Sequence, residues 1–564
     1  MQEVHVPDRP WYRFYEPGVP RTIAYPEVPL WKFLEESARK YPAHTALIFF
    51  GKRIAYGELW EAVERFAHAL EQLGVRKGDR VALMLPNSPQ FVIAFYGALR
   101  IGATVVGLNP LYTARELAFM LNDSLASTLV VLRPMFPRYR EVADSTPVQR
   151  VIVTGVEDYL PWPKNWLYPL KARREGSWVE VSPTATIHLF RSVLERHPPR
   201  PSSVSIDPRE DVALLLYTGG TTGTPKAAML THFNLVANCL QVKSWMPSLQ
   251  EGREVIQGVL PFFHSYGLTA VLNLGMAIAA TVVLQPRFVL EEVLKSTQRY
   301  RVTLFPGVPT MYVAINTSEL SRRYNLRSVR LCISGAAPLP VEVAQQFERI
   351  TGARLVEGYG LSEASPVTHT NPLFGQRKFG SIGIPLPDVD AQIVDEEGKP
   401  LPPGEVGELI VRGPNVMKGY WNRPEETARA LRDGWLYTGD MARMDEEGYF
   451  YIVDRKKDMI IVGGFNVFPR EVEEVLFEHP KIKEAVVVGV PDPYHGEIVK
   501  AYVVLRSGEQ ATEQEIIEFC RERLASYKVP RQVEFRADLP KSMVGKVLRR
   551  VLLEEERQRM AGNT

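Results

Sequence analysis

The run Tyr217–Lys226 (YTGGTTGTPK) combines residue types that a bound polyphosphate requires. Glycines let backbone N–H groups approach an anion closely, threonine hydroxyls add hydrogen-bond donors, and Lys226 supplies a positive charge. The run is not a Walker A loop, because Lys226 follows a proline and does not lead directly into a helix. We predict a phosphate-binding turn between a buried strand at Val212–Tyr217 and a short second strand, with a helix beginning near Thr231. A plain surface turn is the alternative, since clusters of Gly, Ser and Thr usually form one.

Further segments carry residue types suited to an anionic ligand. In chain order they are Pro261–Gly267 (PFFHSYG), Ser334–Leu339 (SGAAPL), Gly358–Glu363 (GYGLSE), Asp433–Asp440 (DGWLYTGD), Asp454–Asp458 (DRKKD) and Pro540–Lys546 (PKSMVGK). Each alone has an ordinary explanation. A histidine in an aromatic run is usually a satisfied core residue, glycines often end strands, and most charged loop residues are solvated. Their joint occurrence is the informative feature.

Together and in this order, these segments resemble the signatures of the adenylate-forming superfamily, which includes acyl-CoA synthetases, luciferases and peptide-synthetase adenylation domains. The resemblance covers most of the chain from about Leu30 onward. The segment DGWLYTGD is similar to the fatty acyl-CoA synthetase signature. Asn109–Thr113 (NPLYT) and Pro161–Leu170 (PWPKNWLYPL) resemble bacterial long-chain fatty acid:CoA ligases.

The resemblance implies a ligase with two half-reactions. ATP, with Mg²⁺, activates a long-chain fatty acid to acyl-AMP and pyrophosphate, and coenzyme A then displaces AMP to give acyl-CoA. No carrier-protein signature of the Leu-Gly-Gly-x-Ser type follows the last segment, so free coenzyme A is the expected acceptor. Two alternatives stay open: a CoA ligase for medium-chain or aromatic acids, and a non-catalytic lipid-binding protein on the same fold. Intact Lys226, Glu363, Asp440 and Lys546 argue against the second.

The resemblance also assigns residues. Tyr359 offers a flat face to the base, Glu363 can hold Mg²⁺, and Asp440 can accept hydrogen bonds from both ribose hydroxyls. The catalytic set is Lys546, Lys226, His264 and Glu363, and the metal ligands are Thr218 and Glu363. The ATP- and AMP-binding set is Thr218, Gly219, Gly220, Thr221, Thr222, Gly223, Thr224, Gly335, Ala336, Ala337, Gly358, Tyr359, Gly360, Leu361, Ser362, Asp440 and Arg455. Gly463, Gly464 and Phe465 are expected to line the coenzyme A channel, with a structural turn as the alternative.

Apolar and amphipathic segments alternate from Leu30 to Val131 and again from Asp211 to about Val453, which predicts an α/β fold of parallel-rich sheets covered by helices. Capping boxes predict helices that begin at Thr113 and Thr512, and proline in the first turn predicts one at Pro469. We expect Leu160–Ser203 to be an excursion from the sheet. The predicted domains are residues 1–453 (ATP- and acyl-binding, with a β subdomain), a hinge at 454–458, and a mobile α+β domain at 459–564.

Composition limits the classes of protein to which the chain can belong. The 564 residues carry a net charge of +2, which gives no reason to expect a nucleic-acid partner. Three scattered cysteines form neither a disulfide framework nor a zinc site, so a reducing cytoplasm is expected. The first twenty residues lack the apolar core of a signal peptide, and the apolar run Leu268–Leu284 is too short for a membrane span, so we read it as buried core. The oligomeric state stays open, with a homodimer among the alternatives.

One segment is suited to a membrane surface. Residues 159–174 interleave aromatic and basic side chains, namely Tyr159, Trp162, Trp166 and Tyr168 with Lys164, Lys171, Arg173 and Arg174. This mixture favours peripheral contact with an anionic membrane. The alternative is a proline-rich surface excursion whose aromatic rings pack on the main domain.

Overall fold

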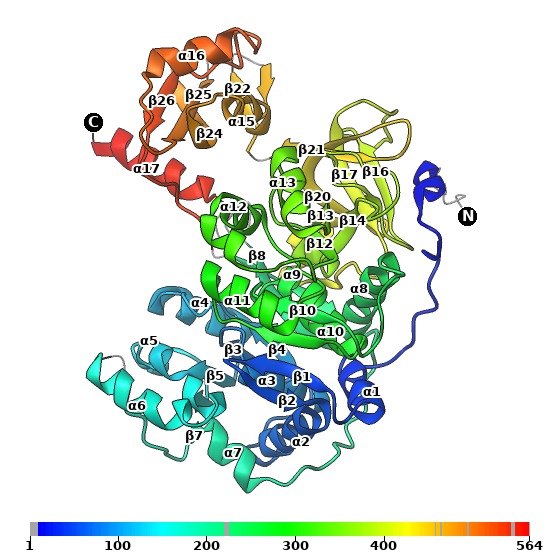
Figure 1. Ribbon diagram of the computed structural model, residues 1–564, viewed down its shortest axis with the longest axis vertical. Helices are drawn as coiled ribbons and strands as arrows, with labels where there is room; N and C mark the ends of the chain where they lie inside the picture. Colours follow the sequence, from blue (N-terminus) through cyan, green and yellow to red (C-terminus); the bar gives the residue numbers. More distant parts are fainter. Residues whose placement is uncertain are drawn as a thin grey trace. The chain divides into compact units, whose positions relative to one another are not determined.

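The computed structural model describes residues 9–176, 178–218, 225–456, 458–462, 465–492, 496–542 and 547–562. Its contacts divide the chain into two compact units (Figure 1). The larger unit comprises Trp11–Asp390 and Arg412–Leu436. The smaller unit is formed mainly by Ala391–Val411 and Tyr437–Thr564.

An eight-stranded sheet is the largest sheet in the described part of the chain, with the order β18-β9-β8-β4-β3-β5-β6-β7. Its strands are β3 (Arg80–Met84), β4 (Thr104–Gly107), β5 (Thr128–Leu132), β6 (Arg150–Thr154), β7 (Ile187–Leu189), β8 (Val212–Thr218), β9 (Lys226–Thr231) and β18 (Gly419–Tyr420). The strands from β8 to β7 pair in parallel, whereas β9 and β18 join antiparallel. The predicted parallel-rich α/β fold is therefore confirmed.

Two smaller sheets complete the parallel-rich part of the larger unit. One has the order β10-β11-β1-β2 and the other β12-β13-β14-β15. Their strands are β1 (Thr45–Phe49), β2 (Lys52–Ala55), β10 (Val255–Gly258), β11 (Thr281–Leu284), β12 (Leu331–Ser334), β13 (Arg354–Gly360), β14 (Val367–Thr370) and β15 (Ile384–Pro385). The pairs β1–β11, β10–β11 and β12–β13 are parallel.

Helices cover these sheets as the alternating pattern predicts (Figure 1). They include α1 (Lys32–Lys40), α2 (Tyr56–Gln72), α3 (Pro89–Arg100), α4 (Ala114–Ser124), α5 (Phe136–Arg140), α6 (Lys164–Arg174), α7 (Phe190–Arg196), α8 (His232–Trp245), α9 (Ser265–Gly267), α10 (Leu274–Ala277), α11 (Leu290–Tyr300), α12 (Pro309–Thr317), α13 (Val341–Thr351) and α14 (Pro424–Ala430). On one face of the large sheet, Met120 and Leu121 of α4 pack with Leu129 and Val131 of β5 in a buried core. Burial of apolar area at roughly 25 cal/mol per Å² is the main driving force for this packing.

A five-stranded sheet has the order β16-β17-β20-β19, with β21 paired to β20. Its strands are β16 (Asp390–Val394), β17 (Gly407–Arg412), β19 (Leu431–Arg432), β20 (Trp435–Met444) and β21 (Phe450–Arg455). This sheet corresponds to the β subdomain that the family resemblance implies. β19 and β21 pair antiparallel with β20 across short turns, whereas β18 and α14 lie between β17 and β20 in the chain.

The C-terminal part of the smaller unit is an α+β module. Its sheet has the order β23-β22-β25-β24, with β26 paired to β25. The elements are β22 (Ile460–Val462), β23 (Phe465–Val467), α15 (Pro469–Phe477), β24 (Ile482–Asp492), β25 (Gly496–Leu505), α16 (Glu513–Arg521), β26 (Gln532–Phe535) and α17 (Arg549–Gly562). Val472 and Leu476 of α15 and Ile516 of α16 are buried with Val487 and Val503 of the sheet, so the module has a core of its own.

The predicted helix starts are confirmed. The Thr113 side chain accepts a hydrogen bond from the backbone N–H of Glu116 at 3.3 Å, and Glu116 accepts one in return from the Thr113 N–H at 2.8 Å. Thr231 caps α8 with the same reciprocal pair of bonds, Thr512 caps α16 by accepting from the Glu515 N–H at 3.2 Å, and α15 begins at Pro469. Each cap satisfies backbone donors that the first helical turn leaves unpaired, which is why the local sequence identifies it.

Two predictions about the segments between these elements had different outcomes. Most of Leu160–Ser203 lies off the sheet, but the expectation is wrong for Ile187–Leu189, which pairs in parallel with β6 as strand β7. This strand has only three residues, so it lacked a recognisable apolar alternation. Leu268–Leu284 is almost wholly buried, as predicted. Among the residues that the structure describes, no helix is both long and apolar enough to cross a bilayer.

Candidate active site

The predicted phosphate loop stands on a β-hairpin. β8 and β9 pair antiparallel, with Thr218 opposite Lys226 at the end of the ladder. The Thr218 hydroxyl lies 3.5 Å from the Lys226 carbonyl oxygen. Residues Gly219, Gly220, Thr221, Thr222, Gly223 and Thr224 lie outside the described residues, so their assignment remains a prediction. The antiparallel pairing of β8 and β9 confirms the two strands expected on either side of the loop.

The base of this loop is held by the carboxylate of Asp123, a half-buried residue that the sequence analysis missed. The Tyr217 hydroxyl donates to Asp123 Oδ2 at 2.9 Å, and Arg423 donates to Asp123 Oδ1 at 2.6 Å. Burial, reinforced by the Asp123 charge, raises the pKa of Tyr217 far above its ordinary value, so the tyrosine stays a hydrogen-bond donor. Asp123 lies at the end of α4, and nothing in its local sequence indicates that it would meet Arg423.

The first aromatic segment is fixed by one buried amide. Asn87 donates to the carbonyl oxygens of Gly258 and Leu260 and accepts from the N–H of Phe262 at 2.8 Å. The loop that carries His264 is therefore anchored directly after β10. His264 itself is half-buried, and its Nδ1 accepts a hydrogen bond from the Tyr266 N–H at 3.3 Å. A partly accessible histidine on an anchored loop is compatible with the predicted role at a substrate pocket.

The second and third motif segments meet because their strands are parallel. β12 ends at Ser334 and β13 at Gly360, with Ser334 opposite Glu357 in register. The carboxyl ends of parallel strands share one edge of a sheet, which is where open α/β folds bind ligands. The first segment joins them there, since the hydroxyl oxygens of Ser265 and Ser362 lie 3.3 Å apart. The structure thus brings three of the predicted segments together.

Backbone geometry accounts for the small residues of these segments. A Cβ atom at Gly360 would lie 2.1 Å from the Pro366 carbonyl oxygen, so no other residue fits there without a backbone shift. Ala336 has a φ of +67°, a left-handed conformation that is strained for a residue with a side chain. Such strain, of order 1 kcal/mol or more, is typical of ligand-binding loops.

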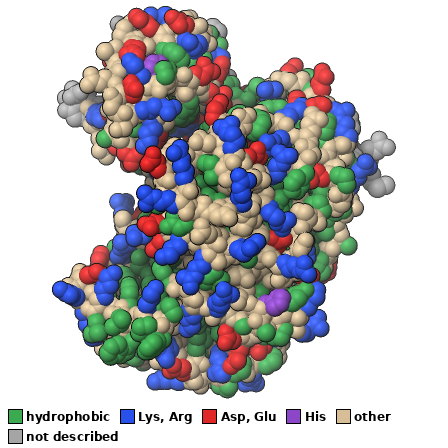
Figure 2. All heavy atoms as spheres, in the orientation of Figure 1, with side chains coloured by type: hydrophobic (Ala, Val, Ile, Leu, Met, Phe, Trp, Pro, Cys, Tyr) green, Lys and Arg blue, Asp and Glu red, His purple; other side chains and the backbone are tan. Residues whose placement is uncertain are grey.

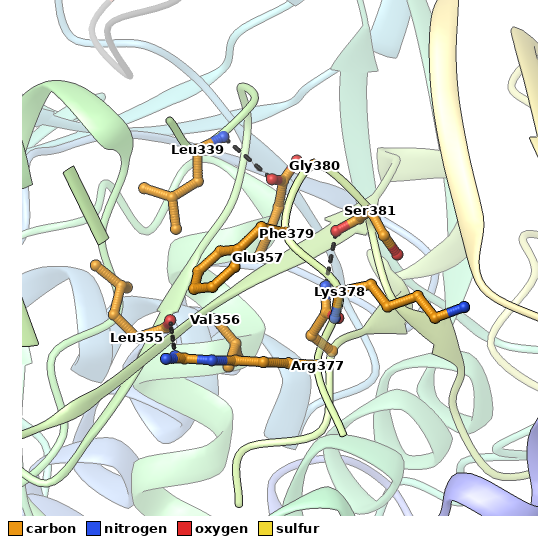
Figure 3. A pocket seen from close by; sticks show the side chains of 10 residues that line it. Leu339, Leu355, Val356, Glu357, Arg377, Lys378, Phe379, Gly380 and Ser381 are labelled. Atoms are coloured by element: carbon orange, nitrogen blue, oxygen red, sulfur yellow. Dashed lines mark hydrogen bonds between the residues drawn. The ribbon is translucent and has the colours of Figure 1, made fainter. Parts of the chain in front are cut away.

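Glu357 connects the second and third segments, and it too was missed. Its carboxylate accepts a hydrogen bond from the backbone N–H of Leu339 at 3.1 Å (Figure 3). A small pocket lies beside this contact, lined by Leu339, Val356, Glu357 and the segment Arg377–Ser381. In Figure 3 the Glu357 side chain reaches across from β13 to the turn that carries Leu339. The contact therefore sets the spacing between SGAAPL and GYGLSE.

Glu363 and Lys226 are joined by a tyrosine that the sequence analysis did not identify. The Tyr420 hydroxyl donates to Glu363 Oε1 at 2.9 Å, and the Lys226 ammonium lies 5.3 Å from the centre of the Tyr420 ring. The second carboxylate oxygen, Oε2, accepts no hydrogen bond from the described residues. Lys226 and Glu363, the two side chains predicted to act on the phosphates and their metal ion, thus contact the ring and the hydroxyl of the same tyrosine.

The donor set fits a magnesium ion that arrives with phosphate. Carboxylate oxygen is the ligand type that Mg²⁺ prefers, and nucleotide sites commonly hold the ion with one or two carboxylates plus phosphate oxygens. Within the described part of the chain, no group of three or more His, Cys, Asp and Glu residues could form an all-protein site. Glu363 therefore suits the predicted role, and the half-buried Thr218 hydroxyl is a second oxygen donor at the loop base.

The smaller unit carries the other predicted nucleotide residues. Asp440 and Arg455 are cross-strand partners in β20 and β21, with Asp440 Oδ1 3.5 Å from Arg455 Nε. Facing residues on adjacent strands can act on one ligand group, as predicted for the ribose. Phe465 begins β23. Gly463, Gly464 and Lys546 lie outside the described residues.

The charged run at 454–458 is not a plain solvated segment. Asp454 is buried and accepts hydrogen bonds from the N–H groups of Arg455 and Arg470, both at 2.7 Å. Arg549 lies 3.9 Å from Asp454 and 3.3 Å from Asp458, and it binds Glu473 through two hydrogen bonds of 2.6 and 2.8 Å. An arginine three residues beyond Lys546 in sequence thus neutralises the predicted hinge.

Comparison with known proteins identifies the class. The family model "AMP-binding enzyme" matches residues 34–421, and "AMP-binding enzyme C-terminal domain" matches residues 471–546. The chain belongs to this family of adenylate-forming enzymes.

Individual relatives show a more specific similarity than the family models do. The chain is 50% identical over 550 residues to a long-chain-fatty-acid–CoA ligase of Bacillus subtilis (97% of this chain, 98% of the relative). It is 40% identical over 556 residues to a ligase of that name from Escherichia coli, with the same coverage. Among solved structures, ATP-bound MatB from Rhodopseudomonas palustris is similar with a TM-score of 0.82 and 31% identity, covering 94% of this chain and 99% of that one.

Proposed function

We propose that this protein is an ATP-dependent long-chain fatty acid:CoA ligase that works through an acyl-AMP intermediate. The observation that carries the proposal is the convergence of Lys226 and Glu363 on Tyr420, beside the shared edge where β12 and β13 end. The Lys226 cation and the Glu363 carboxylate lie next to the carboxyl ends of parallel strands, where open α/β sheets bind ligands. Together they form a site suited to a nucleoside triphosphate with its metal ion. Full-length relatives with the ligase name support the choice of substrate.

The first half-reaction joins two anions that repel each other. A fatty carboxylate oxygen forms a bond to the α-phosphorus of ATP, and the bond to pyrophosphate breaks. Lys226 and, in this proposal, Lys546 neutralise charge on the phosphate oxygens, while Tyr359 and Asp440 hold the base and the ribose. Bound through Glu363 and the phosphates, Mg²⁺ would supply further neutralisation. The rate enhancement is of the positioning and electrostatic type.

The second half-reaction needs a different nucleophile at the same carbon. The coenzyme A thiolate attacks the acyl carbon of acyl-AMP, and the bond to the phosphate oxygen breaks to release AMP. We assign this step to a rotation of residues 459–564 about the hinge at 454–458, relative to residues 1–453, with Gly463, Gly464 and Phe465 lining the channel. Conformational steps of this kind commonly order multistep reactions. Three buried free cysteines, Cys239, Cys332 and Cys520, are in keeping with a cytoplasmic protein.

An exchange assay tests the proposal. Purified protein is incubated with ATP, labelled pyrophosphate and one carboxylic acid at a time, and label appearing in ATP reports reversible acyl-AMP formation. We expect fatty acids of long chain length to support exchange at far lower concentrations than medium-chain or aromatic acids do. Thioester formation on addition of coenzyme A tests the second half. Exchange with aromatic acids alone, or none with any acid, would contradict the proposal.

We further propose that α6 and the residues before it contact an anionic membrane. Trp162 is 84% exposed and Trp166 is 71% exposed, whereas Tyr159 and Tyr168 are half-buried. Leu170 follows Trp166 by four residues and shares its helix face, so the exposed apolar side chains form a patch. Figure 2 shows hydrophobic side chains gathered with basic ones over this region, at the lower left.

The charges around the exposed apolar patch also favour an anionic membrane as the partner. Lys164, Lys171, Arg173 and Arg174 are all exposed around the patch. Glu175 and Glu180 pair with Lys171 and Arg173, which leaves Lys164 and Arg174 without an acidic partner among the described residues. An apolar patch with flanking cations binds the boundary between headgroups and acyl chains, where long-chain substrates are stored.

Vesicle co-sedimentation tests the contact. Wild-type protein should sediment with vesicles that contain anionic lipid, and less as salt increases. Replacement of Trp162 and Trp166 by serine should reduce binding severalfold, whereas Phe374→Ser, which removes another exposed aromatic side chain, should leave it unchanged. Wild-type protein that stays in the supernatant at low salt would refute the contact.

A further inference from the structure

Tyr420 lies on a short strand that joins two parts of the nucleotide site. β18 pairs antiparallel with β9, with Tyr420 opposite Ala228 and Gly419 opposite Met229. Flanking backbone hydrogen bonds extend the contact, from Lys418 N–H to the Met229 carbonyl at 2.9 Å and from Trp421 N–H to the Ala227 carbonyl at 2.8 Å. The segment before β18 binds the other part, since the Met417 N–H donates to the Glu363 carbonyl at 2.8 Å. Residues 417–421 therefore connect the strand of Lys226 to the segment of Glu363.

Strand geometry determines where the Tyr420 ring points. Side chains alternate along a strand, so Lys226 and Ala228 lie on one face of β9, and Tyr420, opposite Ala228, lies on that face as well. Lys226 is then the diagonal cross-strand neighbour of Tyr420, within reach of a long side chain. The distance of 5.3 Å between its ammonium and the ring centre is within the range of a cation–π contact.

The hydroxyl end of the same side chain reaches Glu363. At 2.9 Å, the bond from Tyr420 to Glu363 Oε1 is within the range of O–H···O hydrogen bonds, and its acceptor is a carboxylate. In this bond the tyrosine hydroxyl is the donor and the carboxylate oxygen the acceptor. The Tyr420 N–H donates to Thr427 Oγ1 at 2.9 Å, which fixes the backbone beneath the ring.

We infer that Tyr420 is a positioning residue for the magnesium–phosphate group of ATP, holding the Glu363 carboxylate and the Lys226 ammonium in one arrangement. One carboxylate oxygen of Glu363 binds Tyr420, so the other is presented in a defined direction to the metal. The ring keeps the lysine extended beside it. Tyr420 itself need not touch the substrate. This inference rests on the proposed function, because it assigns how the proposed ATP site is organised.

Tyr420→Phe removes the hydroxyl and keeps the ring, so it tests the contact with Glu363 separately from the contact with Lys226. Loss of a hydrogen bond to a charged group should raise the Mg²⁺ concentration for half-maximal pyrophosphate exchange about tenfold. Because the loss concerns metal binding, the maximal rate at saturating Mg²⁺ should stay within about threefold of wild type and the KM for the fatty acid should not change. Tyr420→Leu, which also removes the ring, should raise the KM for ATP further.

Two controls exclude a merely structural effect. Tyr25→Phe removes another tyrosine–carboxylate hydrogen bond of the larger unit, of 2.7 Å to Asp388, and should leave the Mg²⁺ dependence unchanged. In a double-mutant cycle, Tyr420→Phe should add little to Glu363→Gln, because both changes disrupt the same contact. Additive effects in the cycle would overturn the inference.

The closing experiment measures ATP binding by calorimetry with and without Mg²⁺, which requires no acid substrate. Support consists of wild-type binding that Mg²⁺ strengthens, a weaker Mg²⁺ effect in Tyr420→Phe, and unchanged metal-free binding. An unchanged Mg²⁺ effect in a Tyr420→Phe protein of wild-type melting temperature overturns the inference and leaves the proposed function standing. Wild-type protein that does not bind ATP at any Mg²⁺ concentration overturns both.

Discussion

Replacing Arg549 with methionine should destabilise the smaller unit and should do so most strongly at neutral and alkaline pH. Arg549 is the cation that faces three acidic groups, Glu473, Asp454 and Asp458. The Glu473 side chain is 13% exposed and that of Asp454 only 3%. Methionine keeps much of the side-chain length but removes the charge, so buried carboxylates lose their counterion.

The size of the effect follows from this burial. Removing one partner of a buried ion pair typically costs about 3–5 kcal/mol, because the other charge stays buried without compensation. The lower value, about 3 kcal/mol, is appropriate because the Arg549 side chain is 21% exposed and water can approach it. For a unit of this size, that loss corresponds to a decrease in melting temperature of about 6–12 °C.

The pH dependence has a definite sign. Burial raises the pKa of Glu473 and of Asp454, while Arg549 opposes the shift. A carboxyl group whose pKa is raised on folding binds its proton more tightly in the folded state, so stability falls as pH rises through the folded-state pKa. Without Arg549 both pKa values rise further. The difference between variant and wild type should therefore be large at pH 7–8 and should shrink as pH decreases toward the ordinary carboxyl pKa of about 4.

Urea or thermal unfolding at several pH values measures this difference. Arg523→Met is a matched control in the same unit, because Arg523 pairs with the exposed Glu522 and Glu478 and should contribute less than about 1 kcal/mol. Adding Glu473→Gln to Arg549→Met should recover part of the lost stability. If Arg549→Met behaves like Arg523→Met, or if its loss is equal at pH 5 and pH 8, the ion network does not hold this unit together.

Other substitutions test the proposed roles. Lys546→Ala should slow acyl-AMP formation about 10²- to 10³-fold while coenzyme A attack on supplied acyl-AMP survives, and equal loss in both half-reactions would contradict the assignment. Asp440→Ala should raise the KM for ATP more than the KM for the fatty acid, since a ribose contact stabilises the bound ground state and the transition state equally. A change in the KM for the fatty acid alone would mean that Asp440 does not lie in the nucleotide pocket. Lys457→Pro should impair one half-reaction and spare the other, because a fixed φ denies one of two conformers. Proportional loss of both steps, or no loss, would count against the hinge.

Local features were predictable from the sequence because they depend on neighbouring residues. The caps at Thr113 and Thr512 use side chains three residues from the groups they bind, and the two strands that flank the phosphate loop follow from the apolar runs on either side of its glycines. The buried strands were recognisable in the sequence as continuous apolar segments. Strand β7 did not, because three residues are too few for a pattern.

Through their resemblance to the adenylate-forming superfamily, the motifs together also indicated which chemistry to expect. They did not tell how the side chains would be held. Asp123 meets Arg423, Glu363 meets Tyr420 and Arg549 meets Asp454 and Glu473 across long stretches of chain. Nothing in the local sequence around Asp123, Tyr420 or Arg549 indicates these pairings.

The sequence by itself thus determined the class of fold and, through the family resemblance, indicated the reaction and the charged residues to expect. Only the tertiary structure decided which side chains orient them. The physical reason is that a helix cap or strand pattern is stabilised within a few residues, whereas the partner of a buried charge depends on which distant strands pair. β18 lies beside β9 through backbone hydrogen bonds that almost any residue could make, and this pairing, with the bond from Met417 to the Glu363 carbonyl, brings Tyr420 between Lys226 and Glu363.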